Sequence, residues 1–208
     1  MSALLAALRD VLVPPRCAGC GDPGAWFCVG CRDLCEPARV VAGRLTVHGA
    51  GVHEGPLRDA IHRLKYRGEP GLATELGALV AARVAADLAA GTTLDAVVPV
   101  TLHRARVAER GYDQAGLLAE AVARGVALPL RVALHRIRAG VPQVRLDRTA
   151  RRENVRGAFV ASCGSLRGLR LALVDDVATT GATLGAAAAA ARAAGALSVR
   201  AYVVAIDA

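Results

Sequence analysis

The sequence predicts an α/β protein with a mostly parallel sheet flanked by helices and a small additional subdomain at the N-terminus. Apolar residues at 171–174 have the pattern of a strand buried on both faces, and a helix-forming alanine run follows at 186–191. Hydrophobic residues make up 54% of the chain and aromatic residues only 3%, so the core must consist mainly of Ala, Val and Leu. The 208 residues suffice for one α/β domain of ordinary size and a small appendage.

Turn signals and hydrophobic periodicity predict the remaining elements. Strand-like patterns run over 40–53, and Gly55-Pro56 precedes a helix predicted over 57–66 that ends near Gly68. The elements predicted after it are an amphipathic helix over 72–90, a buried strand over 94–100, a helix that opens at 111–114 and runs to Arg124, and a last strand over 199–206. We expect a helix and metal-binding finger over 1–40 and the α/β domain over 41–208.

Four cysteines near the N-terminus have the spacing of a zinc site. Their pattern is Cys-x2-Cys-x7-Cys-x2-Cys, and it comprises Cys17, Cys20, Cys28 and Cys31. Two disulfides are the alternative, but the N-terminus has no basic start and no small-residue cleavage site, which argues against secretion and predicts a cytoplasmic, reducing location. Because protein thiolates fill all four positions, we predict a structural zinc ion. Cys35 and Cys163 are interpreted as spare or buried thiols.

The charge of the chain favours anionic partners. The formal net charge is +8, and 25 of the 26 basic residues are arginines, which suits phosphates or nucleic acid. Lys65, the single lysine, lies at the end of a predicted helix, where we favour a role as a partner of the helix dipole. No apolar stretch of membrane-spanning length is free of charge, so we expect no membrane insertion.

Two acids and a small hydroxyl-rich loop follow the strand predicted at 171–174. In an open α/β sheet, ligands bind beyond the carboxyl ends of the strands, and the free N–H groups of a following helix attract an anion. The threonines and the glycine of this loop suit a phosphate, whereas Asp175 and Asp176 are placed to accept hydrogen bonds from vicinal sugar hydroxyls. The sequence therefore predicts a sugar-phosphate site. The competing interpretation is a buried strand in which one acid caps the helix and the threonines satisfy a turn.

Two basic segments are candidates to face the same ligand. Residues 101–106 follow the strand predicted over 94–100 and carry arginines suited to a diphosphate, although a solvated basic turn fits the same residues. Residues 131–156 hold eight arginines against two acids and lack apolar periodicity in the middle. We predict a long mobile loop there, with a lid over about 138–156 that closes over a polyanion. A solvated helix face is the alternative.

Several motifs, taken in order along the chain, resemble the ComF family. Residues 175–183 are similar to the phosphoribosyl pyrophosphate (PRPP) signature of type I phosphoribosyltransferases, and no lysine follows the glycine as it does in a P-loop. The ComF resemblance covers the cysteine pattern together with LKYRG at 64–68, PVTLHRAR at 99–106, ERGYDQAGLLAEA at 109–121, RRENVRGAF at 151–159 and DDVATTGAT at 175–183. It implies a zinc finger joined to a phosphoribosyltransferase domain and, as in the best-known members, a role in natural transformation.

The resemblance also implies a role for each motif. Asp175 and Asp176 would bind the ribose hydroxyls as the catalytic acid pair, and Mg²⁺ would accompany PRPP. The 5-phosphate would be held by Ala178, Thr179, Thr180, Gly181, Ala182 and Thr183. The pyrophosphate loop would comprise Thr101, Leu102, His103 and Arg104, and the flexible lid would include Arg148, Arg151, Arg152 and Asn154. Thr101 replaces the usual Pro and Tyr112-Asp113 the usual Phe-Asn, so the shape of the pyrophosphate loop stays open.

Two functions remain open at this point. In the first, the chain is an enzyme that transfers the phosphoribosyl group of PRPP to an acceptor. In the second, the fold keeps its sugar-phosphate pocket as a sensor, while the basic lid and the finger bind single-stranded DNA or a DNA-uptake helicase partner. The basic segment contains few aromatics for base stacking, so any nucleic-acid contact would be mainly electrostatic.

Overall fold

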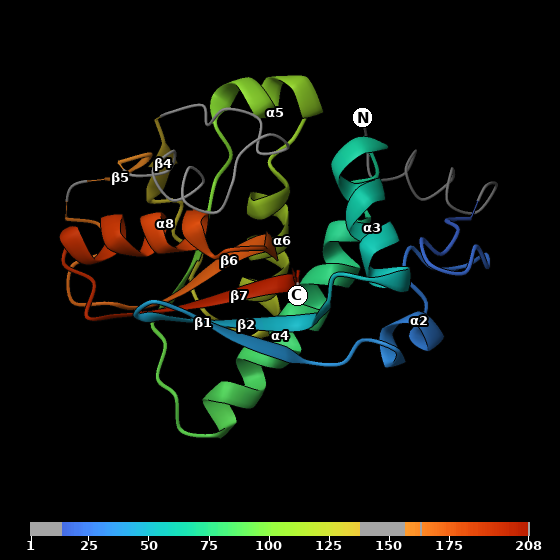
Figure 1. Ribbon diagram of the computed structural model, residues 1–208, viewed down its shortest axis with the longest axis horizontal. Helices are drawn as coiled ribbons and strands as arrows, with labels where there is room; N and C mark the ends of the chain where they lie inside the picture. The colour runs from blue at the N-terminus through green and yellow to red at the C-terminus, as the bar shows by residue number, and fades with distance from the viewer. Residues whose placement is uncertain (1–13, 138–156, 163, 208) are drawn as a thin grey trace.

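A five-stranded sheet in the order β1-β2-β7-β6-β3 lies at the centre of the molecule (Figure 1). The computed structural model describes residues 14–137, 157–162 and 164–207. Only the β1–β2 pair is antiparallel within this sheet. The strands are β1 (Ala38–Ala42), β2 (Leu45–Val52), β3 (Ala96–Pro99), β6 (Arg170–Ala178) and β7 (Ser198–Ile206). The mostly parallel sheet predicted from the sequence is confirmed.

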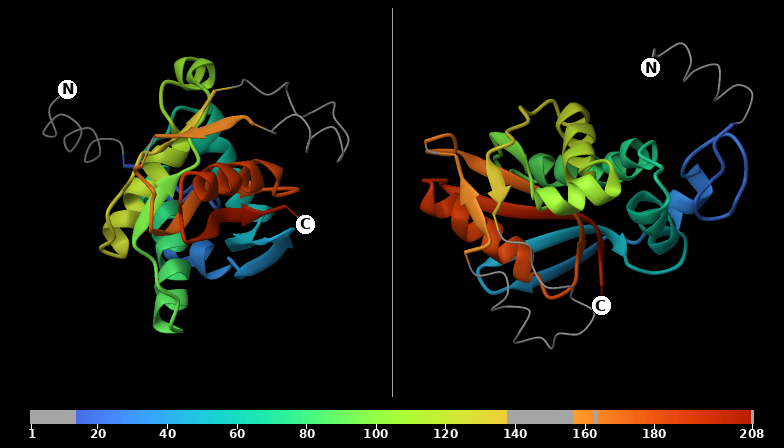
Figure 2. Two further views of the ribbon diagram at one scale, coloured as in Figure 1. Left: turned by 90° about the vertical axis from the view of Figure 1, so that its left-hand side faces the viewer. Right: turned by 90° about the horizontal axis from the view of Figure 1, so that it is seen from above.

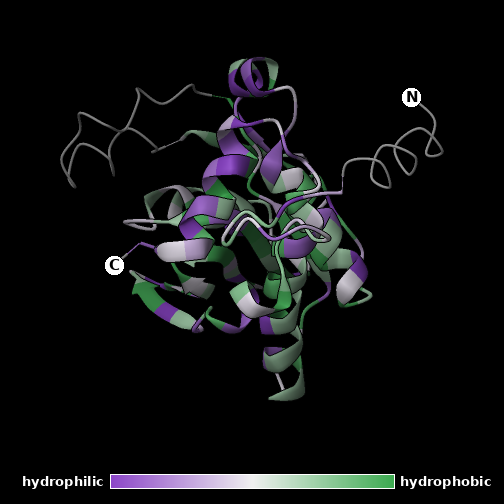
Figure 3. Cartoon of the chain, turned by 90° about the vertical axis from the view of Figure 1, so that its right-hand side faces the viewer, coloured by the Kyte–Doolittle hydropathy of each residue, from purple (hydrophilic) through white to green (hydrophobic). Residues whose placement is uncertain are grey.

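Helices cover both faces of this sheet (Figure 2). One face packs against α3 (Gly55–Tyr66), α4 (Leu72–Ala89) and α6 (Gln114–Gly125), and the other packs against α8 (Ala182–Ala193). Side chains alternate along a strand, so in β6 Ala172 and Val174 lie in the core on the first face and Leu171 and Leu173 in the core on the second. Figure 3 shows hydrophobic residues gathered at the sheet and hydrophilic residues on the short helix at the top, α5 (Arg104–Arg110), which buries none of its residues.

A two-stranded hairpin lies beside α8. It consists of β4 (Leu134–Arg136) and β5 (Phe159–Ala161), and Leu134 and Phe159 are buried in the core on the α8 side. The loop predicted from residue 131 is therefore wrong over its first residues, because apolar burial makes 134–136 a strand. The lid predicted over 138–156, with Arg148, Arg151, Arg152 and Asn154, lies outside the described residues.

Two further boundaries differ from the sequence prediction. β6 continues past Val174 to Ala178, because β7 pairs with it as far as Ile206, so both acids lie within the strand. β3 pairs with β6 only up to Val174, which leaves the two acids beyond the end of β3. The loop predicted over 101–106 ends at His103, because α5 begins at Arg104.

The part of the chain that the structure describes holds no helix with both the length and the apolar composition needed to cross a bilayer.

Candidate functional site

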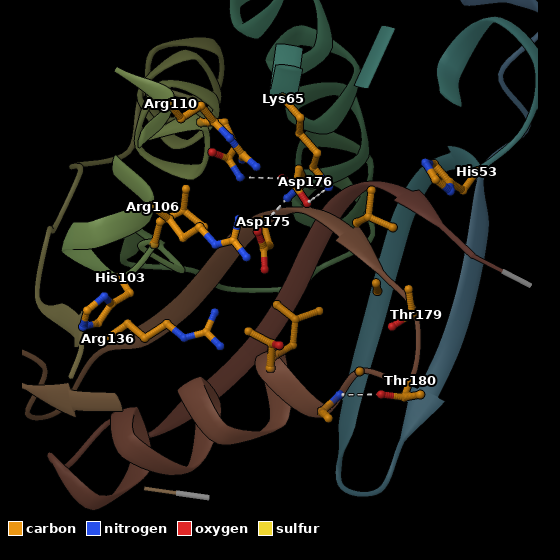
Figure 4. A pocket seen from close by; sticks show the side chains of 18 of the residues that line it. His53, Lys65, His103, Arg106, Arg110, Arg136, Asp175, Asp176, Thr179 and Thr180 are labelled. Carbon is orange, nitrogen blue, oxygen red and sulfur yellow. Dashed lines mark hydrogen bonds and ion pairs between the residues drawn. The ribbon is translucent and has the colours of Figure 1, made fainter. Parts of the chain in front are cut away.

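A cavity of about 350 Å³ opens at the carboxyl edge of β6 (Figure 4). Its wall includes the whole run from Asp175 to Leu184, that is, the acids, the loop after β6 and the first turn of α8. The opposite wall comes from the segments after β3, from α3 and from β4. This volume is that of a small-ligand pocket, and its position is the one where open α/β sheets bind ligands.

The loop between β6 and α8 has the shape of an anion cradle. Gly181 precedes α8 in a left-handed conformation with φ of 70°, and no side chain caps the helix at this position. Thr180 Oγ1 accepts a hydrogen bond from the Ala182 N–H at 3.4 Å. A Cβ on residue 181 would come within 2.6 Å of the Ala42 Cβ, so only glycine fits this turn against β1. The first turn of α8 therefore presents N–H groups and positive dipole to the cavity.

Replacing Gly181 with Ala is expected to weaken phosphate binding at least tenfold, about 1.4 kcal/mol. The new methyl group would meet Ala42 and the residue would be held at a strained φ, so the turn must move away from the cavity. Calorimetric titration with inorganic phosphate measures the effect. The matched control is Gly185→Ala, since a Cβ at this helical position meets no atom within 4 Å. Equal phosphate affinity in both variants would contradict the cradle.

Asp176 is held by two side chains from different helices. Lys65 Nζ, in the last turn of α3, lies 2.9 Å from Asp176 Oδ1, and Gln114 Nε2, at the start of α6, donates to Oδ2 at 2.8 Å. Burial raises the pKa of Asp176, but the Lys65 ammonium and the hydrogen bonds from Gln114 and the backbone together outweigh burial, and the net pKa is lowered. The sequence interpretation of Lys65 as a dipole partner missed this ion pair, which joins residues far apart in the chain.

Asp175 has a different environment. Its Oδ1 accepts the backbone N–H of Asp176 at 2.8 Å, and Arg136 on the opposite wall interacts electrostatically with it. Burial, together with the neighbouring Asp176 charge, raises the pKa of Asp175 well above its ordinary value. Because the pKa of Asp175 is higher in the folded state than in the unfolded state, the free energy of unfolding falls as pH rises through the folded-state pKa. Below the ordinary carboxyl pKa, Asp175 is protonated in both states and does not lower this free energy.

We expect Asp175→Asn to stabilise the unliganded protein. At neutral pH the change removes a buried charge next to Asp176, and a gain of about 1 kcal/mol corresponds to roughly 2–4 °C in Tm for a chain of this size. The difference should shrink as pH falls below the ordinary carboxyl pKa, because Asp175 is then neutral in both states. Thermal unfolding across pH measures it. Asp176→Asn is the comparison and should lower Tm, because it leaves Lys65 without its partner.

Arginines on the far side of the cavity supply positive charge. Arg106, Arg110 and Arg136 line it, and Figure 4 shows them facing the acid pair. Arg110 lies over the Tyr66 ring, 5.4 Å from the centroid, and its Nη1 is buried without a hydrogen-bond partner in the described chain. Burial lowers the pKa of Arg136, yet a guanidinium stays charged at any physiological pH. The wall opposite the acids can therefore neutralise a polyanion.

Only part of the segment predicted to bind the pyrophosphate, residues 101–104, lines the cavity. Leu102 and His103 line the cavity, and the His103 ring accepts a hydrogen bond from the Ala105 N–H at 3.3 Å as the cap of α5. Thr101 Oγ1 instead donates to the Leu134 carbonyl oxygen at 2.9 Å, and Arg104 is not part of the cavity wall. Arg106 belongs to the 101–106 segment whose arginines were expected to suit a diphosphate. Arg110 and Arg136 were not assigned from the sequence, although Arg110 belongs to the motif at 109–121.

The four cysteines form a second site, away from the cavity. The sulfur atoms of Cys17, Cys20, Cys28 and Cys31 all lie within 4.8 Å of one another, and two of the pairs are 3.6 Å apart. Ligands at about 2.3 Å around a tetrahedral zinc ion are about 3.8 Å apart, so the cluster fits zinc without a large movement. Burial raises the pKa of Cys17, but backbone N–H donors led by Cys28 reduce it to about 6, which favours the thiolate that a metal needs.

The cysteine cluster packs directly against α3. Arg63 Nη1 donates to the Cys17 carbonyl oxygen at 3.2 Å, and Arg63 Nε lies 2.7 Å from Glu69 Oε2. Phe27, between the two cysteine pairs, is fully buried in the core that contains α3. Cys35 donates to the Cys31 carbonyl oxygen and is not part of the four-sulfur cluster. The last turn of α3 thus contacts the cysteines through Arg63 and the acid pair through Lys65.

The mostly parallel sheet with helices on both faces, and the cavity at the carboxyl edge of β6, define the class: this is an open α/β protein with a small-ligand cavity and a cysteine cluster that could hold a metal ion. Competence protein F of Haemophilus influenzae is 30% identical over 175 residues, which span 82% of this chain and 75% of that protein. The DNA utilization protein YhgH of Salmonella typhimurium is 31% identical over 176 residues, 81% and 74% of the two chains. The chain belongs to the competence protein F (ComF) family, as its motifs predicted.

Two solved structures share part of this fold. One is described as the allosteric regulatory enzyme of purine biosynthesis, with 21% identity, a TM-score of 0.48, and coverage of 69% of this chain and 30% of that chain. Another is the glutamine PRPP amidotransferase from B. subtilis, with 20% identity, a TM-score of 0.47 and coverage of 70% and 30%. This chain spans about a third of the length of either structure. The chain matches no protein-family model.

Proposed function

We propose that the cavity binds PRPP or another ribose 5-phosphate together with Mg²⁺, and that the protein acts in DNA uptake as a phosphoribosyltransferase. The proposal rests on one observation: three groups of residues with different chemistry line a single cavity. They are the acid pair Asp175–Asp176, the N-terminus of α8 behind its small loop, and the three arginines on the opposite wall. Each group matches one part of PRPP: the vicinal hydroxyls, the 5-phosphate and the diphosphate. The names of the relatives support a role in DNA uptake or utilization.

The proposed roles follow the chemistry of the walls. Asp175 and Asp176 accept hydrogen bonds from the ribose hydroxyls, and residues 178–183 hold the 5-phosphate. Arg106, Arg110 and Arg136, with the backbone at Leu102–His103, face the diphosphate and stabilise the negative charge that develops as it leaves C1. Catalysis in this proposal comes from positioning and from these cations, since no described side chain in the cavity is assigned as a general acid or base.

Mg²⁺ suits this cavity because it prefers carboxylate and phosphate oxygens. It usually binds through one or two carboxylates together with substrate phosphates and water, and Asp175 and Asp176 are the carboxylates in the wall. When bound, Mg²⁺ would supply neutralisation of the diphosphate charge. Zinc is proposed for the cysteine cluster, in a closed structural site.

Binding and turnover can be separated in one set of assays. We expect Mg²⁺-dependent binding of PRPP by calorimetry and release of pyrophosphate once an acceptor is present. No binding of PRPP or ribose 5-phosphate would refute the proposal. Salt-sensitive binding of single-stranded DNA with PRPP binding but without pyrophosphate release would favour the alternative, a sugar-phosphate sensor. The net charge of +8 is the observation behind that alternative.

A further inference from the structure

The Asp176 carboxylate is fixed by donors on both of its oxygens. Lys65 approaches Oδ1 from the last turn of α3 and Gln114 approaches Oδ2 from the start of α6, as Figure 4 shows for Lys65. The side chains of Asp176 and Lys65 are only 8% and 20% exposed, so the ion pair is shielded from water. A carboxylate accepts about four hydrogen bonds, so Asp176 keeps capacity for a ligand hydroxyl in a preset orientation.

Lys65 contacts one acid of the pair. Asp175 and Asp176 are adjacent on one strand in a buried site, where two negative charges oppose each other. The ammonium lies against Asp176, whereas Arg136 on the opposite wall interacts electrostatically with Asp175. Asp176 is therefore the acid whose carboxylate is held in place by side chains of α3 and α6.

The Lys65–Asp176 pair is largely buried. Burial lowers the pKa of Lys65, but the charges and hydrogen bond of its neighbours, led by Asp176, together outweigh burial and the net pKa is raised. A surface ion pair contributes little, whereas breaking a shielded pair leaves a buried charge without its partner. Loss of either residue should therefore disturb the position of the other.

We propose that Lys65 is a positioning residue of the sugar site, which holds the Asp176 carboxylate in the orientation that accepts a hydrogen bond from a ribose hydroxyl. Lys65 acts through Asp176 and needs no contact with the ligand. This inference rests on the proposed function for its ligand, but the ion pair can be tested without any ligand.

The first test uses the fact that Lys65 is the single lysine of the chain. Protein labelled with ¹⁵N at lysine Nζ gives one side-chain signal in an NMR spectrum. We expect the chemical shift of this signal at neutral pH to differ between the wild type and Asp176→Asn, because the ammonium loses its carboxylate partner. Identical signals in the two proteins would overturn the proposed partnership.

The second test measures affinity for ribose 5-phosphate at neutral pH. Lys65→Met should weaken binding about tenfold, because Asp176 loses the ammonium that holds its carboxylate in place. Lys65→Arg should restore most of the affinity. Arg58→Met is the matched control, because Arg58 lies on α3, is exposed and pairs only with Asp59 in the described chain.

A double-mutant cycle shows whether Lys65 acts through Asp176. Adding Lys65→Met to Asp176→Asn should cause little further loss, whereas independent roles would make the two losses additive. An affinity for Lys65→Met like that of Arg58→Met would overturn the inference. If the wild type binds no ribose 5-phosphate, the proposed function fails, while the NMR comparison still reports on the ion pair. If Lys65→Met does not fold, Lys65→Arg and the NMR spectrum of Asp176→Asn still decide the question.

Discussion

Asparagine at both positions 175 and 176 is expected to lower the affinity for Mg·PRPP at least tenfold, about 1.4 kcal/mol. The change keeps the shape of both side chains but removes the negative charges that make strong acceptors for the ribose hydroxyls and for a metal-bound ligand. It also leaves Lys65 and Gln114 without a carboxylate to bind. Calorimetry with PRPP and Mg²⁺ measures the loss directly.

Asp59→Asn is a suitable control for this double variant. Asp59 is half exposed on α3, pairs with Arg58 and does not line the cavity. It should therefore leave PRPP affinity unchanged. An unchanged affinity in the double variant as well would refute the assignment of the acid pair to the sugar, since no other carboxylate of the described chain lies in the cavity wall.

Loss of metal from the cysteine cluster is expected to lower thermal stability strongly. The four sulfur atoms lie within 4.8 Å of one another, and Cys17 and Cys31 are buried in the core that contains α3. Without a cation, the four sulfur atoms lose the ion that would join them, and the packing of the finger on α3 loosens. A loss of about 3 kcal/mol would lower Tm by roughly 6–12 °C. Thermal unfolding with and without a chelator measures it.

Cys28→Ser and Cys35→Ser form a matched pair for this prediction. Cys28 belongs to the cluster, while Cys35 lies near it and donates only to a backbone carbonyl. The first variant should lose bound zinc and stability, and the second should retain both. If Cys28→Ser kept a full complement of zinc, the four-cysteine assignment would be wrong.

The elements that could be predicted from the sequence are those that a local pattern determines. The apolar run before Asp175, the small loop around Gly181 and the alanine helix after it lie next to one another in the chain, so their order alone indicated the strand, the loop and the helix. The cysteine spacing likewise predicted a cluster that the structure contains. The end of β6 was placed too early because its last residues are stabilised by pairing with β7, a strand that comes later.

The contacts that could not be predicted join segments distant in the sequence. Lys65 and Gln114 reach Asp176 only because α3 and α6 pack on the same face of the sheet. Arg110 and Arg136 line the cavity because of the positions of α5 and the hairpin, and no local pattern distinguishes them from the other arginines of this arginine-rich chain. The direction of a long side chain depends on tertiary packing, which the sequence pattern does not specify.

The last turn of α3 is a shared support, because Arg63 contacts Cys17 and Lys65 contacts Asp176 only two positions further along the chain. Related sequences should reflect this arrangement. A relative without the four cysteines would need other contacts to stabilise the last turn of α3, or would also lack the lysine at the position of Lys65. Cysteine cluster and lysine should therefore be retained or lost together as the family diverges.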